Sequence, residues 1–440
     1  MNARAAHVLD TLRTQLWPLP ALAVALAVVM GVALPALDSA VDGELPENVG
    51  AFLFSGGPEA ARSILQAISG SLITVTSLTF SLTVVTLQLA SSQFSPRLLR
   101  TFTSDRFVHG TLALFLAAFA FALTVLRTVR DEGSGNTAFV PEISVTVAFA
   151  LAIASVVGLV LFLAHMAREI RVETMMRRVN LETQETIDRV FADDRPTQGP
   201  GPVPASRAVP INSYSSGFLT SVDKDALLRT VTTCGAVVRL DLPPGSSLVV
   251  GVPFATAWAL DKGTALGEEA RETLTQEVNA ALATGFERTN VQDVGFGFRQ
   301  LVDVAVRALS PGINDPTTAV HVIGHLSDLL CRLADKNPGA EHLTDDDGRI
   351  RVVLSLPTLR DLLDMAMDQP RKYGAADPAV ADRLLGLLHE LTWCDPKGQY
   401  REEILEHLEQ MRIAILAAGY SGPQLRSLLK KADSRRLAQE

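Results

Sequence analysis

The chain has 440 residues, 48% of them hydrophobic, and its mean hydropathy is positive, which is high for a wholly soluble protein. Its formal net charge is −9, so bulk electrostatics does not favour nucleic acid as a partner. The three cysteines, Cys234, Cys331 and Cys394, are widely spaced and include no C-x-x-C pair. They therefore indicate neither a disulfide framework nor a zinc ribbon.

Apolar residues are concentrated in the first 170 positions, which predicts a transmembrane domain over residues 1–168. Four segments each hold close to the ~20 apolar residues that cross a bilayer. We expect these spans at Leu19–Leu37, Ser69–Ala90, Phe107–Leu126 and Ile143–His165. The first resembles a signal peptide, but its apolar run is long and no suitable A-x-A cleavage site follows. We therefore interpret it as an uncleaved span.

The charges that flank the spans predict their orientation. Arginines precede the first span, lie between the second and third, and follow the fourth; they include Arg4, Arg13, Arg97, Arg100, Arg106, Arg168 and Arg171. The loop between the first two spans is acidic instead, with Asp38, Asp42, Glu44, Glu47 and Glu59. The positive-inside rule therefore places both termini in the cytoplasm.

Beyond the fourth span the sequence predicts an α+β cytoplasmic region. We expect a helical stalk at 169–191, a Pro/Gly linker at 192–210, a small β-rich subdomain at 211–262 and a mainly helical domain at 263–440. The stalk has apolar residues at coiled-coil spacing, so it either joins subunits or packs on its own soluble domain. The expected fold class is an α-helical membrane protein with four transmembrane helices and an α+β C-terminal region.

Short strands alternate with one helix in the β-rich subdomain. The strands are expected at Gly217–Asp223, Ala236–Leu242, Ser247–Val252 and Phe254–Ala259, and the helix at Lys224–Thr233. One more strand, Arg349–Leu356, is expected within the helical domain. The remaining segments have the periodicity of amphipathic helices.

The second span is rich in hydroxyl side chains but has no charge. On a helical projection one polar stripe contains Thr76, Thr79, Thr83 and Thr86, and a second contains Thr74, Ser77, Ser81, Gln88 and Ser92. Hydroxyl residues form hydrogen bonds across close helix contacts, which fits a helix buried at the centre of the bundle. Hydroxyls also replace part of an ion's hydration shell, so the first stripe fits a pore lining as well. Both interpretations remain open.

The charges in and near the spans bear on transport. No Asp, Glu, Lys or Arg lies deep in any span, which argues against pumps and ion-coupled transporters, since these use intramembrane ionisable groups. Gln93, Arg97 and Arg100 are predicted to form the cytoplasmic mouth of the second helix. In an oligomer these arginines would attract anions or select against cations. Alternatively, they contact anionic lipid heads.

A helix break at Ser310–Asp315 separates two helices of the C-terminal region. Asp315 has the position of an N-cap, because Pro316 follows it at the first helical position. Asn314 and Asp315 are also candidates to bind a ligand, although capping is the simpler role.

His321, His325 and Asp328 share one face of the helix that follows the break. This spacing is a weak metal candidate, because H-x-x-x-H alone is common and no H-E-x-x-H pattern supplies a base. No catalytic constellation and no phosphate-binding G-x-x-x-x-G-K-[ST] loop occurs. We therefore expect neither an enzyme nor a cofactor.

Four stretches of the sequence are distinctive as a set. They are TFSLTVVTLQLASSQFSPRLLRTF (Thr79–Phe102), LRTVR (Leu126–Arg130), FVPEISVTVA (Phe139–Ala148) and RALSPGINDP (Arg307–Pro316). Together they resemble a family of bacterial predicted membrane proteins known only as a domain of unknown function. The resemblance implies a multi-span protein of the bacterial inner membrane with a cytoplasmic region and no assigned activity.

The function expected from the sequence is an oligomeric channel or passive pore for ions or small solutes. The second helix would line the pore, and the cytoplasmic domain would serve regulation or assembly. The alternative is a membrane-anchored scaffold or sensor whose cytoplasmic domain binds a protein or a small ligand. The expected partners are the lipid bilayer and further copies of the chain, and no nucleic acid.

Overall fold

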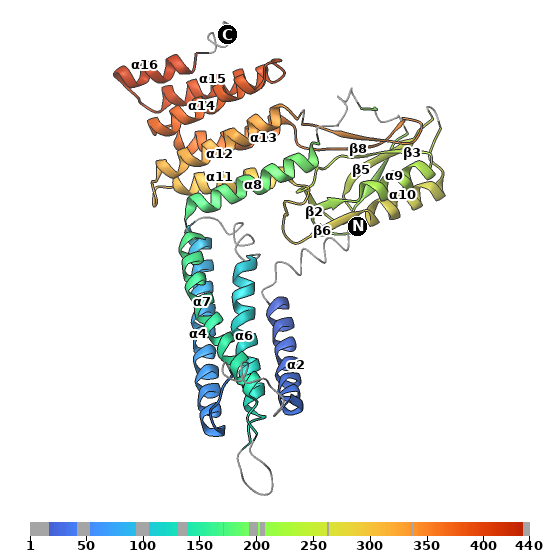
Figure 1. Ribbon diagram of the computed structural model, residues 1–440. Coiled ribbons are helices and arrows are strands. Elements are labelled where there is room, and N and C mark those ends of the chain that lie inside the picture. The colour runs from blue at the N-terminus through green and yellow to red at the C-terminus, as the bar shows by residue number, and fades with distance from the viewer. Residues whose placement is uncertain are drawn as a thin grey trace. The chain divides into compact units, whose positions relative to one another are not determined.

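The fold is taken from a computed structural model of the chain. The structure describes residues 17–41, 53–93, 105–130, 139–169, 171–192, 201–202, 207–261, 264–336 and 338–433. The chain divides into two compact units (Figure 1). We call residues 9–171 the membrane unit and residues 172–440 the C-terminal unit.

Four long helices make up the described part of the membrane unit (Figure 1). They are α2 (Pro18–Val41), α4 (Pro58–Gln93), α6 (Arg106–Leu126) and α7 (Glu142–Glu169). Each is long and apolar enough to cross a bilayer, which confirms the four predicted spans. Proline opens α2 and α4, where its missing N–H has no helical partner to lose. Asp105 caps α6 by accepting a hydrogen bond from Phe107 N at 2.8 Å.

The central helix of the membrane unit is α6, which packs against each of the other three. One apolar cluster includes Leu65, Leu72, Phe121, Val125 and Val145. A second consists of Val108, Leu112, Phe162 and Met166, with Leu82 packed against it. Helix α4, which one interpretation of the sequence placed at the centre, buries one face against the bundle and leaves the opposite face exposed. The small buried side chains of α6, Ala118 and Ala122, let its neighbours approach closely.

Polar contacts connect helix ends within the membrane unit. Asp38, near the end of α2, accepts hydrogen bonds from Ile143 N at 2.9 Å, Ser144 N at 3.1 Å and the Ser144 hydroxyl at 2.6 Å. Its carboxylate therefore caps α7, whose first N–H groups have no partner inside the helix. Arg62 of α4 donates through Nη2 to Val129 O, which follows α6, at 3.1 Å.

Two sheets form the β part of the C-terminal unit (Figure 1). The larger has the order β1 (Val209–Asn212), β5 (Pro253–Ala259), β3 (Ala236–Leu240), β8 (Ile350–Leu354) and β7 (Glu341–Thr344). The smaller has the order β4 (Ser247–Leu248), β2 (Gly217–Val222) and β6 (Leu282–Gly285). Helices α9 (Lys224–Thr233) and α10 (Glu268–Ala280) contribute to the same core. The strands pair antiparallel except β3 and β8, which are parallel.

The predicted domain boundary at residue 262 differs from the structure. Strands β6, β7 and β8 come from the part expected to be mainly helical, yet β6 pairs with β2 and β8 pairs with β3. In the β3–β8 pair Val238 lies opposite Val352, and both are buried in one core with Leu227 of α9. A parallel pair needs a long crossover, so the sheet draws strands from two distant stretches of the chain.

The remaining helices of the C-terminal unit pack against one another (Figure 1). They are α8 (Val172–Val190), α11 (Val294–Ala308), α12 (Pro316–Ala334), α13 (Leu359–Gly374), α14 (Pro378–Cys394), α15 (Arg401–Ala417) and α16 (Gly422–Lys431). Helix α8, the predicted stalk, packs on α11 and α12, and Arg332 pairs with its Asp188. Of the two roles left open by the sequence, packing on its own soluble domain is therefore observed.

Candidate functional site: the polar faces of α4

Helix α4 has polar stripes on opposite sides. Thr76, Thr79, Thr83 and Thr86 form a buried stripe, which faces the rest of the membrane unit. A second stripe is exposed; we call it the exposed seam, and it consists of Ser63, Ala67, Gly70, Thr74, Ser77, Ser81 and Gln88. The four threonines predicted to line a pore thus point toward the other helices of their own chain.

The buried hydroxyls mostly bond to α4 itself. Thr76 donates to Leu72 O at 2.7 Å, and Thr86 donates to Leu82 O at 2.9 Å. The Thr83 hydroxyl donates in the same way to the carbonyl of Thr79 at 2.8 Å. The Thr79 hydroxyl itself is buried, with a residue exposure of 1%, and has no partner among the described residues. It is therefore the hydroxyl of this stripe that has a hydrogen bond left to offer.

The exposed seam runs along α4 in steps of three and four residues, with one step of seven before Gln88. That spacing keeps its members on a single face over several turns. Its side chains are small or polar, and no charged residue occurs between Ser63 and Gln93. The described part of the chain does not cover this face. Its composition is typical of helix surfaces that meet another helix in a membrane.

The predicted cytoplasmic mouth falls mostly on parts of the chain that the structure does not describe. Gln93 is the last residue of α4, and its side chain is not among those described. Arg97 and Arg100 lie outside the described residues. Their role at a mouth stays a prediction.

A histidine–aspartate pair, which the sequence analysis did not single out, joins the start of α6 to the end of α7. Nε2 of His165 lies 2.6 Å from Oδ2 of Asp105, and the Phe107 ring packs against the imidazole with centroids 4.7 Å apart. Asp105 immediately precedes an apolar helix, which is the N-cap signal that points to it. Its pairing with His165 depends on helix packing, and no local pattern reveals it.

The helix break around Asp315 has the predicted geometry. Asp315 caps α12, accepting a hydrogen bond from Thr318 N at 3.0 Å and from the Thr318 hydroxyl at 2.6 Å. Asn314 before it has φ of +50°, a left-handed conformation that asparagine tolerates better than most residues. The hydrogen bonds from Thr318 hold the pKa of the Asp315 carboxyl below its usual value. Both oxygens of this ligand candidate are thus engaged within the chain.

Alanine at Asp315 is expected to lower the free energy of unfolding of the C-terminal unit by about 1 kcal/mol, the usual cost of losing an N-cap. Because the pKa of Asp315 is lowered in the folded chain, its stabilisation is present above the unfolded carboxyl pKa. It is lost as the pH falls through the folded pKa. Urea titrations of wild type and Asp315→Ala at a series of pH values measure this. A difference that grows on acidification would contradict it.

The metal candidate is not brought together as a ligand set. His321 and Asp328 are exposed, and Asp328 Oδ2 accepts hydrogen bonds from Asn180 Nδ2 at 3.0 Å and Gln184 Nε2 at 2.8 Å. Burial lowers the pKa of His325. Among the described residues, no group of three or more His, Cys, Asp or Glu side chains is placed to hold a metal. Asp328 instead fastens α8 to α12.

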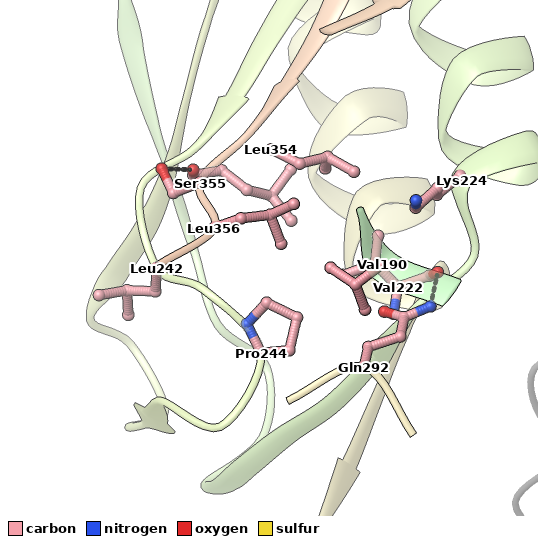
Figure 2. Close-up of a pocket in the computed structure, with 10 residues that line it drawn as sticks. Val190, Val222, Lys224, Leu242, Pro244, Gln292, Leu354, Ser355 and Leu356 are labelled. Atoms are coloured by element: carbon pink, nitrogen blue, oxygen red, sulfur yellow. Dashed lines mark hydrogen bonds between the residues drawn. The ribbon is translucent and has the colours of Figure 1, made fainter. Parts of the chain in front are cut away.

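A pocket lies between the two sheets and the end of α8 (Figure 2). It is lined mainly by apolar side chains, among them Val190, Val222 and Leu354. Gln292 closes one side of the pocket. Its Oε1 accepts a hydrogen bond from Val222 N at 2.8 Å, and its Nε2 donates to Val222 O at 3.1 Å. The pocket volume of about 20 Å³ has room for roughly one water molecule. The pocket therefore offers no space for a larger ligand.

The sequence comparisons agree with an architecture of four apolar helices and an α+β unit. Residues 13–390 match the family described as predicted membrane protein (DUF2254). The chain belongs to this family. Uncharacterized proteins of Mycobacterium bovis and Mycobacterium tuberculosis are each 36% identical to it over 392 residues, covering 88% of this chain and 73% of theirs. No solved structure matches the chain.

Membership of the DUF2254 family confirms the resemblance read from the four sequence stretches. It establishes that the chain is a predicted membrane protein of unknown function, and it assigns no channel, ligand or reaction. The match extends from before the first span into α14, so the family unit includes both the membrane helices and most of the C-terminal unit.

Proposed function

We propose that the protein is a subunit of an oligomeric channel or passive pore in the bacterial inner membrane. Its termini and C-terminal unit lie in the cytoplasm in this proposal. Each subunit contributes the exposed seam of α4 to a central path for ions or small solutes. The C-terminal unit serves assembly or regulation, and the protein catalyses no reaction and binds no nucleic acid.

The exposed seam of α4 is the observation that carries the proposal. A helix surface that faces lipid holds large apolar side chains, because polar groups find no partner in hydrocarbon. Ile73, Leu78 and Phe80 are exposed side chains of that kind. The seam instead places Gly70, Thr74 and other small or hydroxyl residues at successive turns. Such a face suits contact with a second helix or with water.

The length and neutrality of the seam favour a passive path built from copies of α4. Its steps of three and four residues keep it on one face of α4, so equivalent helices can turn this face toward a common axis. Ser77 and Ser81 lie in the middle of the seam and supply hydroxyl oxygens without charge. Oxygen ligands without ionisable groups fit conduction better than coupled transport, which uses charged side chains inside the membrane.

The pore-lining role of the buried stripe stays a prediction. Its threonines face helices of their own chain, so they are not placed to line a path between subunits. They would suit a path inside the bundle of a single chain, where the Thr79 hydroxyl has a hydrogen bond to offer to water. The two paths use different faces of α4, which makes them separable by mutation.

Leucine at Ser77 or Ser81 is expected to remove most of the ion flux of the protein in liposomes, because a large apolar side chain fills a path between subunits. Valine at Thr79 or Thr83 is the matched control, since it keeps the side-chain shape and deletes a buried hydroxyl. The valine variants should conduct like wild type. The opposite pattern, with flux lost only in the valine variants, would place the path inside one bundle and contradict the proposed lining.

A membrane-anchored scaffold or sensor is the second candidate. A hollow of about 430 Å³ in the C-terminal unit supports it, since pockets of this size hold small ligands. It lies at the turn between α14 and α15, where the highly exposed Trp393 and the side chain of Arg401 line it. Elsewhere in the unit, the break before α12 also exposes Ile313. If this candidate is right, helices of other subunits cover the exposed seam, and the protein conducts no ions.

A further inference from the structure

Exposed apolar side chains of the C-terminal unit gather at one place. Eleven large hydrophobic residues are exposed among its described residues, and five of them lie in three neighbouring segments. We call these five the apolar patch: Tyr214, Val249, Val250, Val252 and Phe286. Each is at least half exposed, and Phe286 reaches 94%. Clustered exposure of this kind marks an interaction surface, whereas single exposed hydrophobic residues do not.

Hydrogen bonds hold the three segments together. Ser213 N donates to Val252 O at 3.0 Å, and Gly251 N donates to Ser213 O at 2.8 Å. The Ser216 hydroxyl oxygen accepts from Val250 N at 3.0 Å. The same loop, residues 213–216, contacts β6 through a hydroxyl pair 3.2 Å apart. The patch is thus a fixed part of the fold, carried by loops at one side of the β4–β2–β6 sheet.

The segments that carry the patch contain no charge. Residues 212–218, 245–257 and 282–286 include apolar and hydroxyl side chains but no Asp, Glu, Lys, Arg or His, and the exposed Glu287 follows directly after Phe286. A neutral surface with an aromatic residue at its rim loses no ionic hydration when it enters a membrane interface. Tyrosine, present in the patch as Tyr214, is also enriched at that depth of a bilayer. The composition therefore fits lipid better than a charged protein surface.

A short connection leads from the last span into the C-terminal unit. Helix α7 ends at Glu169 and α8 begins at Val172, so the chain between them spans at most about 10 Å. Within the C-terminal unit, the start of α8 and the β2–β6 pair lie on the same side, and α16 lies on the opposite side (Figure 1). The side where the chain enters the unit thus also carries the sheet beside the patch.

We infer that the apolar patch is a lipid-contact surface, through which the C-terminal unit inserts side chains into the interface of the bilayer that the helices span. This contact would act as a second anchor and fix the unit against the membrane. It does not depend on the pore proposal, because a scaffold or sensor would use it equally. Since the patch is neutral, the contact should not weaken at high salt.

Tryptophan fluorescence of the full-length protein tests the inference. Phe286→Trp is compared with Tyr373→Trp, an exposed aromatic position on α13 outside the patch. Both variants keep the native tryptophans, so their difference isolates the added residue. In liposomes of phosphatidylcholine brominated on the acyl chains, the residue added at 286 should lose most of its fluorescence. The residue added at 373 should lose almost none, and neither result should change with salt.

Two outcomes would overturn the inference. Equal quenching at 286 and 373 would show that the patch does not enter lipid. A blue-shifted emission at 286 in detergent, without quenching by brominated lipid, would show that a second copy of the chain covers the patch instead. Both substitutions replace an exposed aromatic residue by another, so the fold should persist, and circular dichroism verifies this.

Discussion

Alanine at Gly297 is expected to lower the free energy of unfolding of the C-terminal unit by about 1–3 kcal/mol, the cost of forcing extra volume into a packed contact. Gly297 lies inside α11 against α8. A Cβ there would lie 1.8 Å from Oγ1 and 2.8 Å from Cβ of Thr183. The Cβ of Thr183 is fixed by its backbone, so the two helices would have to separate.

A glycine in the neighbouring helix provides the matched control. Gly324 lies inside α12, and a Cβ there would meet only the Arg383 side chain, at 3.9 Å. Gly324→Ala should therefore stabilise the unit, by roughly 0.5–1 kcal/mol, as alanine does inside a helix. Urea unfolding followed by the fluorescence of Trp258 and Trp393 measures both variants. Equal effects of the two alanines would show that α8 is not packed on α11 in solution.

Alanine at Asp38 is expected to cost the membrane unit about 1–3 kcal/mol, because it leaves buried donors without an acceptor. The Asp38 carboxylate is 8% exposed and accepts all three hydrogen bonds that Ile143 and Ser144 offer at the start of α7. Without it, the positive end of the α7 dipole also loses one negative group, and Glu142 remains in the first turn. The contact between α2 and α7 should loosen as a result.

The next residue along α2 gives the control for Asp38. The Ser39 hydroxyl donates only to Ala36 O of its own helix, at 2.8 Å, and it is exposed. Ser39→Ala should therefore change stability by a few tenths of a kcal/mol. Asp38→Asn, which keeps one acceptor oxygen, should fall between the two. Unfolding in mixed SDS micelles measures the free energy of unfolding of the three variants. An unchanged value for Asp38→Ala would show that the carboxylate does not join α2 to α7.

The membrane helices follow from the sequence because hydropathy over ~20 residues is a strong local signal. The orientation of α4 does not follow from it. Thr79 and Ser77 lie on stripes of similar composition, and helical periodicity separates the stripes without saying which one meets α6. That choice depends on shape matching between helices. The end of α2 does not follow from hydropathy either. The apolar run ends before Asp38, which places this residue in a loop by sequence, but α2 continues to Val41.

In the C-terminal unit, local rules predicted local structure and missed long-range pairing. The helix at Lys224–Thr233 and the N-cap at Asp315 were predicted correctly, because both have capping residues followed by periodic helical patterns. Strands β1, β6 and β7 were missed, since each has only four residues and no clear alternation, and β1 begins inside the expected linker 192–210. The place of β6 comes from pairing with the distant strand β2, whereas β7 forms a hairpin with β8, the next strand in the chain.

Ion flux through the purified wild-type protein in liposomes, with potassium, sodium and chloride measured separately, tests the proposed pore. A passive pore should give a selective flux that requires no energy source and that is mostly lost when leucine replaces Ser77. An oligomer that is correctly folded, as judged by native mass spectrometry and circular dichroism, and yet carries no ion at any voltage would contradict it. That result would favour the scaffold or sensor.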